Sequence, residues 1–310
     1  MPDLPHRYWR PLGWLVLLAW ISLQAGTVSA FQERSLVRHQ PPTGSGDLRD
    51  DYAIGLLHLA LARTEHDFGP ADVHEIGIRM SQDRTVREMR VGRYVDVFWA
   101  TTSHTREAKL EPVRIPLTRG LQGVRVPVVN KDAQHIPDVI DDVEALRNFT
   151  IAQGHDWPDA GILEHNGLQV MRVPSYDSLF RMLEADRYDL FLRGIIELQA
   201  EAAMYDQHGL VPRSGTVIAY YAPNYFFVAP DNHALAFRIE IGLRRALADG
   251  SFHLFMHTHP ATRTGIELLL RDQHTLIALH NPHLPYRTPT WDRELWFEPV
   301  FDQLPDPEAQ

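Results

Sequence analysis

Residues 113–129, VRIPLTRGLQGVRVPVV, are the stretch that decides the fold class. They are extended and carry prolines at positions 116 and 127, a composition that suits edge or connecting strands. A second extended stretch, rich in aromatic residues, runs through VIAYY at 217–221 and YFFV at 225–228. Two such crossings around a middle unit predict one lobe inserted into another. We expect lobe 1 to comprise residues 31–120 plus 217–310, and lobe 2 to comprise 121–216.

Short strands alternate with helices on both sides of the first crossing. The predicted strands are 72–78, 95–99, 149–152, 168–173 and 188–192, and the predicted helices are 54–61, 81–89, 158–165, 175–185, 195–205 and 234–248. The last helix places Leu235, Ile239 and Leu243 on one stripe and stops at Gly250. This alternation predicts an α/β protein with parallel strands covered by helices. The ligand site would then lie in the cleft between the lobes, at the carboxyl ends of the strands.

The composition excludes several classes of function. The chain of 310 residues is long enough for two lobes and contains no cysteine, which excludes disulfides, cysteine zinc sites, iron–sulfur clusters and thiol nucleophiles. The formal net charge is −10, from 40 acidic and 30 basic residues. An acidic balance disfavours nucleic-acid binding, which needs a basic face.

The first thirty residues have the pattern of an export signal. Arg7 and Arg10 precede an apolar run from Leu12 to Leu23, and Val28-Ser29-Ala30 provides small or short residues for a signal peptidase. The run is shorter than the roughly 20 residues that span a bilayer, although an uncleaved signal anchor is the alternative. No later stretch is long and apolar enough to cross a membrane. We therefore expect a signal peptide over 1–30 and a periplasmic product with no membrane span after cleavage.

Three passages resemble the periplasmic solute-binding proteins that serve polar amino-acid transporters, the amino-acid-binding family 3 type. They are Asp50-Asp51-Tyr52-Ala53-Ile54 before a helix, Phe98-Trp99-Ala100-Thr101-Thr102-Ser103-His104-Thr105-Arg106 followed by Pro116, and Asp186-Arg187-Tyr188-Asp189-Leu190-Phe191. The similarity covers roughly residues 31 to 260. It implies the two-lobed periplasmic-binding-protein type II fold, with a ligand cleft between the lobes.

The resemblance implies a ligand-binding role for Arg106. In that family the arginine after the threonine loop grips the ligand carboxylate, and a guanidinium offers a bidentate fork for that group. Thr101 and Thr102 would add hydroxyl donors. The alternatives are a surface Arg106 paired with Glu107 or Glu111, and a structural role for the two threonines.

The turn Gly154-His155-Asp156-Trp157 leads from a predicted strand into a helix. Exposed N–H groups at a helix start make a seat for an anion, so Gly154 is a candidate ligand-binding residue. Trp157 is a candidate wall of the cleft. The alternative for Asp156 is an ordinary helix N-cap.

One departure from the family concerns the stretch after the second-lobe strand. The family usually places a carboxylate there for the ligand's amino group, whereas this chain has Arg193, with Glu197 one helical turn later. Both are candidate ligand-binding residues, and a cleft with Arg106 and Arg193 would suit a more anionic ligand. The alternative is an ion pair between Arg193 and Glu197 at i, i+4.

Seventeen histidines raise the rival hypothesis of a metal site. His257-Thr258-His259-Pro260 resembles the metal-binding turn of the zinc-dependent isopeptidases, but no serine follows Ser251 and the flanking pattern is helical. The sequence has no Gly-x-Ser-x-Gly elbow and no phosphate-binding or dinucleotide glycine pattern. We therefore expect no metal, no cofactor and no catalytic residue.

Together these observations predict a periplasmic solute-binding protein rather than an enzyme. It would bind a small polar or anionic, amino-acid-like ligand between its lobes, for ABC-type uptake or for sensing. Its partner would be a membrane transporter or sensor, and we expect a monomer. The alternatives are a periplasmic metal-dependent hydrolase that uses the C-terminal histidines, and a protein-interaction module that keeps the fold without ligand binding.

Overall fold

The computed structural model describes residues 34–42, 48–271 and 273–305. The predicted signal peptide falls outside these residues. Within them, no helix combines the length and the apolar character that a membrane crossing requires.

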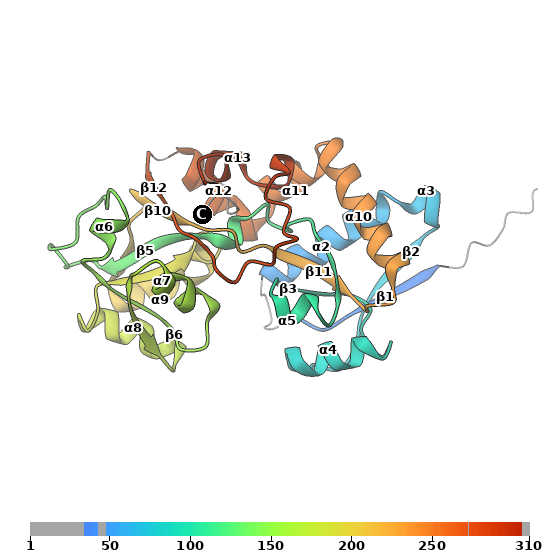
Figure 1. Cartoon of the computed structure of the whole chain (residues 1–310), viewed down its shortest axis with the longest axis horizontal. Coiled ribbons are helices and arrows are strands. Elements are labelled where there is room, and N and C mark those ends of the chain that lie inside the picture. The colour runs from blue at the N-terminus through green and yellow to red at the C-terminus, as the bar shows by residue number, and fades with distance from the viewer. Residues whose placement is uncertain (1–33, 43–47, 272, 306–310) are drawn as a thin grey trace, which may run out of the picture. The chain divides into compact units, whose positions relative to one another are not determined.

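A seven-stranded mixed sheet organises the middle of the chain (Figure 1). Its main path is β12–β10–β5–β8–β6–β7, and β9 pairs with β5 on the edge opposite β8. The strands are β5 (Val124–Asn130), β6 (Thr150–Gly154), β7 (Gln169–Val173), β8 (Leu190–Gly194), β9 (Leu210–Pro212), β10 (Thr216–Ala219) and β12 (Thr275–Ala278). The predicted parallel arrangement holds for β6, β7 and β8, whereas β5 runs antiparallel to β8, β9 and β10.

The N-terminal part of the chain builds two smaller sheets. A parallel pair joins β1 (Ser35–His39) to β2 (Ala71–Glu75). A three-stranded antiparallel sheet has the order β3–β11–β4, formed by β3 (Phe98–Thr101), β4 (Glu111–Val113) and β11 (Asn224–Val228). The chain leaves the three-stranded sheet after β4 and returns to it with β11. The two crossings predicted from the sequence are these passages between the sheets.

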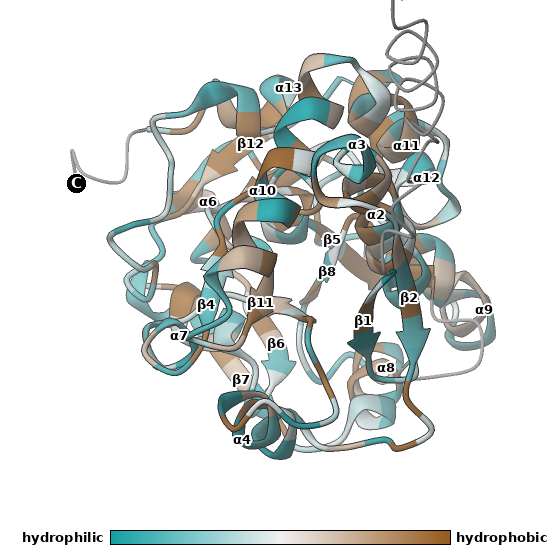
Figure 2. Cartoon of the chain, turned by 90° about the vertical axis from the view of Figure 1, so that its right-hand side faces the viewer, coloured by the Kyte–Doolittle hydropathy of each residue, from teal (hydrophilic) through white to brown (hydrophobic). Residues whose placement is uncertain are grey.

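Helices cover the sheets and contribute further buried apolar side chains to the core. Those associated with the smaller sheets are α2 (Leu48–Ala62), α3 (Glu65–Phe68), α4 (Gln82–Arg90), α5 (His104–Glu107) and α10 (His233–Ala248). Those between the strands of the large sheet are α6 (Val143–Leu146), α7 (Pro158–His165), α8 (Tyr176–Glu184) and α9 (Leu198–His208), and α11 (Ser251–Thr258) and α12 (Pro260–Arg271) follow α10. Brown, apolar strands such as β5 and β11 contrast with the largely hydrophilic α4 in Figure 2.

The predicted lobe boundary at residue 217 differs from the hydrogen bonding of the strands. It assigned β10 and β12 to lobe 1, yet β10 pairs with β5 through Ile218 and Ala219, and β12 pairs with β10 along its whole length. Both strands therefore belong to the large sheet. The reason is that apolar stretches such as Val217–Ala219 fit a central strand position, which the sequence alone does not assign to one sheet or the other.

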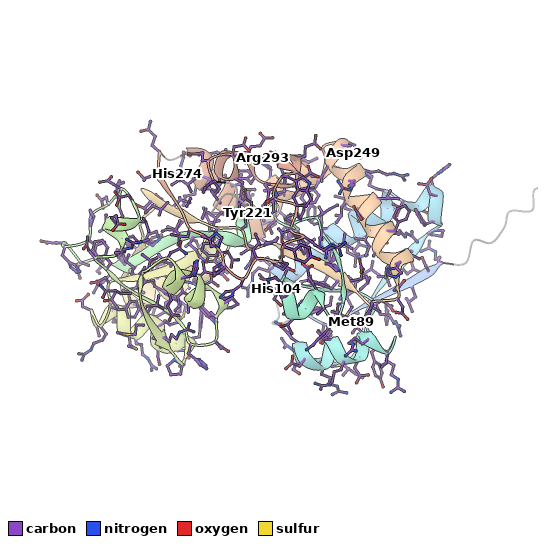
Figure 3. All side chains as sticks on the ribbon, viewed as in Figure 1. Met89, His104, Tyr221, Asp249, His274 and Arg293 are labelled. Atoms are coloured by element: carbon purple, nitrogen blue, oxygen red, sulfur yellow. The ribbon has the colours of Figure 1, made fainter. Side chains whose placement is uncertain are left out.

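The residues after β12, 279–304, form what we call the C-terminal segment. It includes two short helices, η2 (Arg293–Leu295) and α13 (Glu298–Phe301). It begins against the large sheet, where the Leu279 amide donates to the Ala219 carbonyl at 2.9 Å. Midway along the segment, Asp292 pairs with Arg244 of α10 at 3.6 Å. The dark-red segment passes Tyr221, which is labelled in Figure 3.

Candidate functional site

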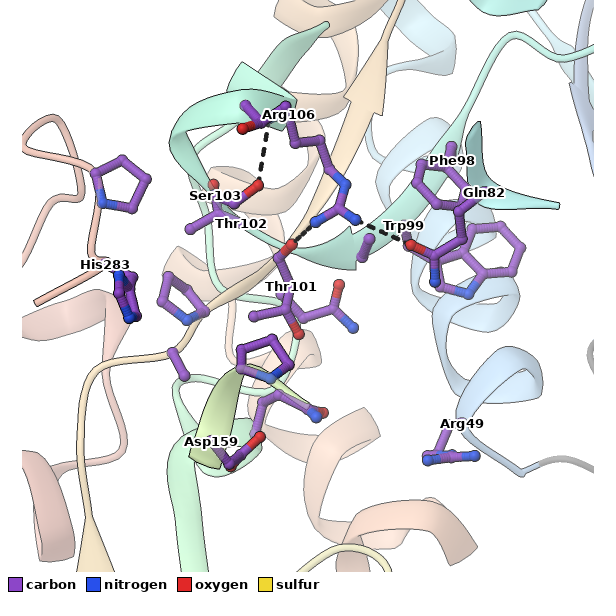
Figure 4. A pocket seen from close by; sticks show the side chains of 18 of the residues that line it. Arg49, Gln82, Phe98, Trp99, Thr101, Thr102, Ser103, Arg106, Asp159 and His283 are labelled. Carbon is purple, nitrogen blue, oxygen red and sulfur yellow. Dashed lines mark hydrogen bonds between the residues drawn. The ribbon is translucent and has the colours of Figure 1, made fainter. Parts of the chain in front are cut away.

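A cleft of about 1130 Å³ lies where the three-stranded sheet, the first turn of α7 and the C-terminal segment meet. Its lining comes from α2, from the loop before α4, from β3 through α5, from the start of α7, and from residues 281–285. Figure 4 shows part of this lining, with the Arg106 side chain extending from α5 and His283 on the C-terminal segment. The cleft is the place that the alternating α/β order predicts for a ligand.

Arg106, a candidate ligand-binding residue from the sequence, is among the residues that line the cleft. Its position is set by α5, which begins when the Ser103 hydroxyl accepts a hydrogen bond from the Arg106 amide at 3.2 Å. The guanidinium donates to the Thr101 carbonyl and, at 2.9 Å, to Oε1 of Gln82 (Figure 4). It also packs over the rings of Phe98 and Phe227. Burial lowers the pKa of this guanidinium from its usual value.

No ion pair in the described part of the chain joins Arg106 to a carboxylate. The alternative partner from the sequence, Glu107, instead pairs with Arg114 at 2.5 Å. Arg106 is therefore a half-buried cation held by neutral acceptors, and such a group favours an anion within its reach.

Thr101 and Thr102 line the cleft beside Arg106. The Thr102 hydroxyl donates to Oε1 of Glu107 at 2.6 Å, which uses its proton within the protein. Thr101 contributes its carbonyl to the Arg106 guanidinium and belongs to β3. The two threonines therefore position the arginine loop in addition to facing the cleft.

Arg125, Asp159 and Tyr220 form a buried cluster on the opposite side of the cleft. Arg125 on β5 is 8% exposed and donates to Oδ1 of Asp159 through Nε at 2.8 Å, and Tyr220 donates to the same carboxylate oxygen. Burial opposes the charge on Arg125, but Asp159 and Tyr220 nevertheless raise its pKa. Burial likewise opposes the Asp159 charge, and Arg125 with Tyr220 holds the pKa of that carboxyl below its usual value. The sequence did not indicate this cluster, because its members lie far apart in the chain, on β5, on α7 and just after β10.

Gly154 and Trp157 lie outside the residues that line the cleft. Trp157 stacks on Phe191 with ring centroids 6.3 Å apart, and a Cβ on Gly154 would come within 2.5 Å of the indole. Trp157 is the N-cap residue of α7 and has no capping side chain there, with Pro158 as the first helical residue. The sequence left an ordinary helix N-cap as the alternative role of Asp156. In the structure Asp156 is instead an exposed residue of the cleft lining.

Arg193 and Glu197 also lie outside the cleft lining. Arg193 is buried and pairs with Glu197 at 2.9 Å, as the alternative stated, and with Glu201. Its guanidinium lies over the rings of Trp157 and Phe191. Burial opposes the charge on Arg193, yet the two carboxylates raise its pKa. The apolar surroundings of β8 direct this arginine into the core, where only a paired charge is tolerated.

Glu197 nevertheless contacts the edge of the site through Arg49. Nη1 of Arg49, a cleft residue on α2, lies 3.0 Å from Oε1 of Glu197. Sequence reasoning missed Arg49, since the spacing of a helix start gives no sign of a partner 148 residues away. It also missed Asn281 and His283, which line the cleft from the C-terminal segment.

The charge of the cleft differs from that of the chain. Its lining contains the four arginines Arg49, Arg79, Arg106 and Arg125, and the three aspartates Asp50, Asp156 and Asp159. The whole chain has 40 acidic and 30 basic residues, so this excess of cations is local. It favours a ligand with negative charge.

The histidines of the rival hypothesis do not form a metal site in the described residues. No group of three histidine or carboxylate side chains there has the arrangement of metal ligands. His257 is the last-turn residue of α11 and faces Phe297 with ring centroids 6.4 Å apart. Both ring nitrogens of His259 are engaged, Nε2 with Asp51 at 3.3 Å and Nδ1 with the Ala261 amide at 3.1 Å. The hydrolase alternative is therefore not supported.

Comparisons with known proteins show the fold. The VFT2 domain of BvgS from Bordetella pertussis, as a double mutant, is 12% identical, with a TM-score of 0.52 over 80% of this chain and 96% of that one. The protein YckB of Bacillus subtilis is 14% identical, with a TM-score of 0.50 over 79% of this chain and 95% of that one. A periplasmic binding protein with high arginine specificity from Salmonella typhimurium is 13% identical, with a TM-score of 0.46 over 73% and 99% of the two chains.

Neither a family model nor a curated protein matches the sequence. The chain has the two-lobed fold of the type II periplasmic binding proteins, and the predicted α/β fold class is confirmed.

Proposed function

We propose that this chain is a solute receptor that binds a small anionic ligand in the cleft. The observation that carries the proposal is Arg106, a half-buried guanidinium that faces the cleft and is held only by neutral acceptors among the described residues. The ligand would present a carboxylate to Arg106, with Thr101 and Thr102 beside it. The two-lobed fold supports a role in binding rather than catalysis.

The surroundings of the receptor are part of the proposal. An export signal over residues 1–30 would place it in a periplasm, as a monomer that delivers its ligand to an ABC-type transporter or reports it to a membrane sensor. Asp159 would not hold an amino group of the ligand, because Arg125 and Tyr220 already bind its carboxylate. The chain would have two lobes, and β10 and β12 would belong to the second lobe, because they pair within the large sheet.

A thermal-shift screen of small carboxylates and amino acids tests the proposal. Ligand binding to the folded state raises Tm, and Arg106→Ala should abolish the rise caused by a carboxylate. Loss of a charge-assisted hydrogen bond of about 1.5–3 kcal/mol corresponds to a roughly 10- to 100-fold higher Kd. Arg87→Ala, which removes an exposed arginine of α4 outside the cleft, is the matched control. A carboxylate that stabilises Arg106→Ala as much as the unchanged protein would contradict the site.

A further inference from the structure

We propose that the C-terminal segment completes the ligand site and that His283 makes a second, proton-dependent contact to an anionic ligand. The inference rests on the proposed function, and it assigns the ligand two acidic groups. One group would bind Arg106 on the first-lobe side, and the other would bind His283 on the side of α7.

The first observation is where the segment lies. Asn281, His283, Leu284 and Pro285 all line the cleft, although the segment follows the last strand of the large sheet. Figure 4 shows His283 on a chain segment separate from those of Arg106 and Arg49, with its side chain among the drawn lining residues. One wall of the cleft is therefore built by residues that follow the last strand of the large sheet.

The second observation is that hydrogen bonds fix this wall. Asn166, at the end of α7, donates to the His280 carbonyl at 2.8 Å and accepts from the His280 amide at 3.0 Å. Asn281 donates to the Tyr221 carbonyl at 2.8 Å, and its own Oδ1 accepts from the His283 amide at 2.9 Å. These bonds hold the backbone of His283 at the edge of the cleft before any ligand arrives.

The third observation is the seat of the imidazole. Nε2 of His283 lies 3.1 Å from the position that a Cβ would occupy on Gly161 of α7. The ring therefore rests over a helix position without a side chain, and it remains exposed to the cleft. An imidazole held in this way is available to a ligand.

The fourth observation is the state of the other cations. Arg125 is paired with Asp159, Arg49 is paired with Glu197, and Arg79, the remaining arginine of the lining, also has an interaction partner. Arg106 and His283 are therefore suited to bind two acidic groups of one ligand. The cleft volume of about 1130 Å³ is large enough for more than a single carboxylate.

Proton dependence follows from the chemistry of histidine, whose charge changes between about pH 8 and 5. The charged or titratable groups that share this part of the cleft lining with His283 are Asp156 in the turn before α7, Asp159 on α7, which is already paired with Arg125, and His104 on α5. His165 lies next to the neighbouring His280, with ring centroids 5.4 Å apart. The test must therefore separate His283 from His104.

Succinate, glutarate and acetate are the probes, and the readout is the ligand-induced rise in Tm together with Kd by calorimetry at about pH 5.5 and 8. We expect a dicarboxylate to bind roughly tenfold more tightly at the lower pH, and acetate to show little of this dependence. His283→Gln should remove the pH dependence and keep the Arg106-dependent binding. His283→Arg, which carries a permanent charge, should bind the dicarboxylate at the higher pH as tightly as the unchanged protein does at the lower pH.

Two controls separate the contributions. His66→Gln removes a histidine whose side chain is 98% exposed, and it should leave binding unchanged. His104→Gln should retain the pH dependence. Dicarboxylate binding that is abolished by Arg106→Ala but unaffected by His283→Gln would overturn this inference and leave the proposed function intact. No binding of any carboxylate to the unchanged protein would overturn both.

Discussion

At the scale of single residues, the arginines of this protein divide by what surrounds them. Arg193 and Arg125 are buried beside carboxylates, whereas Arg106 meets a carbonyl and an amide oxygen. A buried guanidinium with a carboxylate partner already has its charge compensated. Of these three arginines, Arg106 is therefore the one that can bind an anionic ligand. In the sequence, all three arginines lie in or next to extended segments, and only their tertiary partners distinguish them.

Replacing Arg125 by leucine should destabilise the protein strongly. The change leaves the Asp159 carboxylate buried without its cation, and breaking such a pair costs about 3–5 kcal/mol. The double variant Arg125→Leu/Asp159→Leu removes both charges and should cost less than the single change. Urea unfolding of the three proteins measures this difference. A double variant less stable than Arg125→Leu would show that the cluster stabilises through more than charge compensation.

The same cluster predicts how stability depends on acid. The pKa of Asp159 is lower in the folded protein than its usual value, and that of Glu201 is lowered by Arg193 although burial opposes it. A depressed carboxyl pKa contributes stability above the unfolded value, near pH 4, and this contribution is lost as the pH falls through the folded value. The free energy of unfolding should therefore decrease below about pH 4 because of these groups. In Asp159→Asn the decrease should be smaller, since that group no longer takes up a proton, and an unchanged acid dependence would contradict this account.

At the scale of elements, the packing of α10 on α2 depends on a glycine. A Cβ at Gly242 of α10 would lie 2.0 Å from the Ala60 carbonyl oxygen of α2, a distance that atoms do not tolerate. The two helices can approach this closely only because the side chain is absent. Gly242 stands in the middle of the helix that the sequence predicts most clearly.

Gly242→Ala should therefore destabilise the protein by about 1–3 kcal/mol, through forced separation of α10 from α2. In an unconstrained helix the same change is favourable by roughly 0.5–1 kcal/mol, so the sign itself is diagnostic. Gly77→Ala is the matched control, since a Cβ at Gly77 meets nothing within 4 Å. Thermal unfolding of both variants provides the measurement, and a Gly242→Ala protein as stable as the Gly77→Ala protein would show that the helices adapt without cost.

The sequence predicted most elements where local pattern and tertiary role agree. The helix predicted at 234–248 is α10 at His233–Ala248, and the helix predicted at 175–185 is α8 at Tyr176–Glu184. The strand predicted at 95–99 is instead β3 at Phe98–Thr101, since the apolar run continues into the strand that pairs with β11. Strand β12 was missed, because Thr275–Ala278 acquires its conformation by pairing with β10.

At the scale of the whole molecule, one wall of the candidate site could be predicted from the sequence and the other could not. Arg106 and the threonine loop follow from local sequence and resemblance, because one strand and one short helix position them. The wall formed by the C-terminal segment does not follow from local sequence, because its position depends on hydrogen bonds to Asn166 and Tyr221, which are distant in the chain. A proline-rich tail without periodicity gives no sign of where it returns.

The same tail also closes the region where the chain crosses between the sheets. Trp296 and Phe301 pack on Tyr221, with ring centroids 4.7 and 5.2 Å from it. A Cβ at Gly120 in the first crossing would lie within 2.7 Å of both aromatic rings. The Phe297 amide donates to the Arg119 carbonyl at 2.8 Å. The C-terminal segment thus covers both crossings with aromatic side chains, and its folding is coupled to theirs.

Two tryptophans five positions apart test this coupling. Trp296 is 1% exposed against the crossings, whereas Trp291 is 65% exposed. Trp296→Ala should reduce the free energy of unfolding by about 3–5 kcal/mol, because it opens a cavity at Gly120 and Tyr221. Trp291→Ala should change it by no more than about 0.5 kcal/mol. Chemical denaturation compares the two, and equal stabilities would mean that the C-terminal segment lies on the crossings without stabilising them.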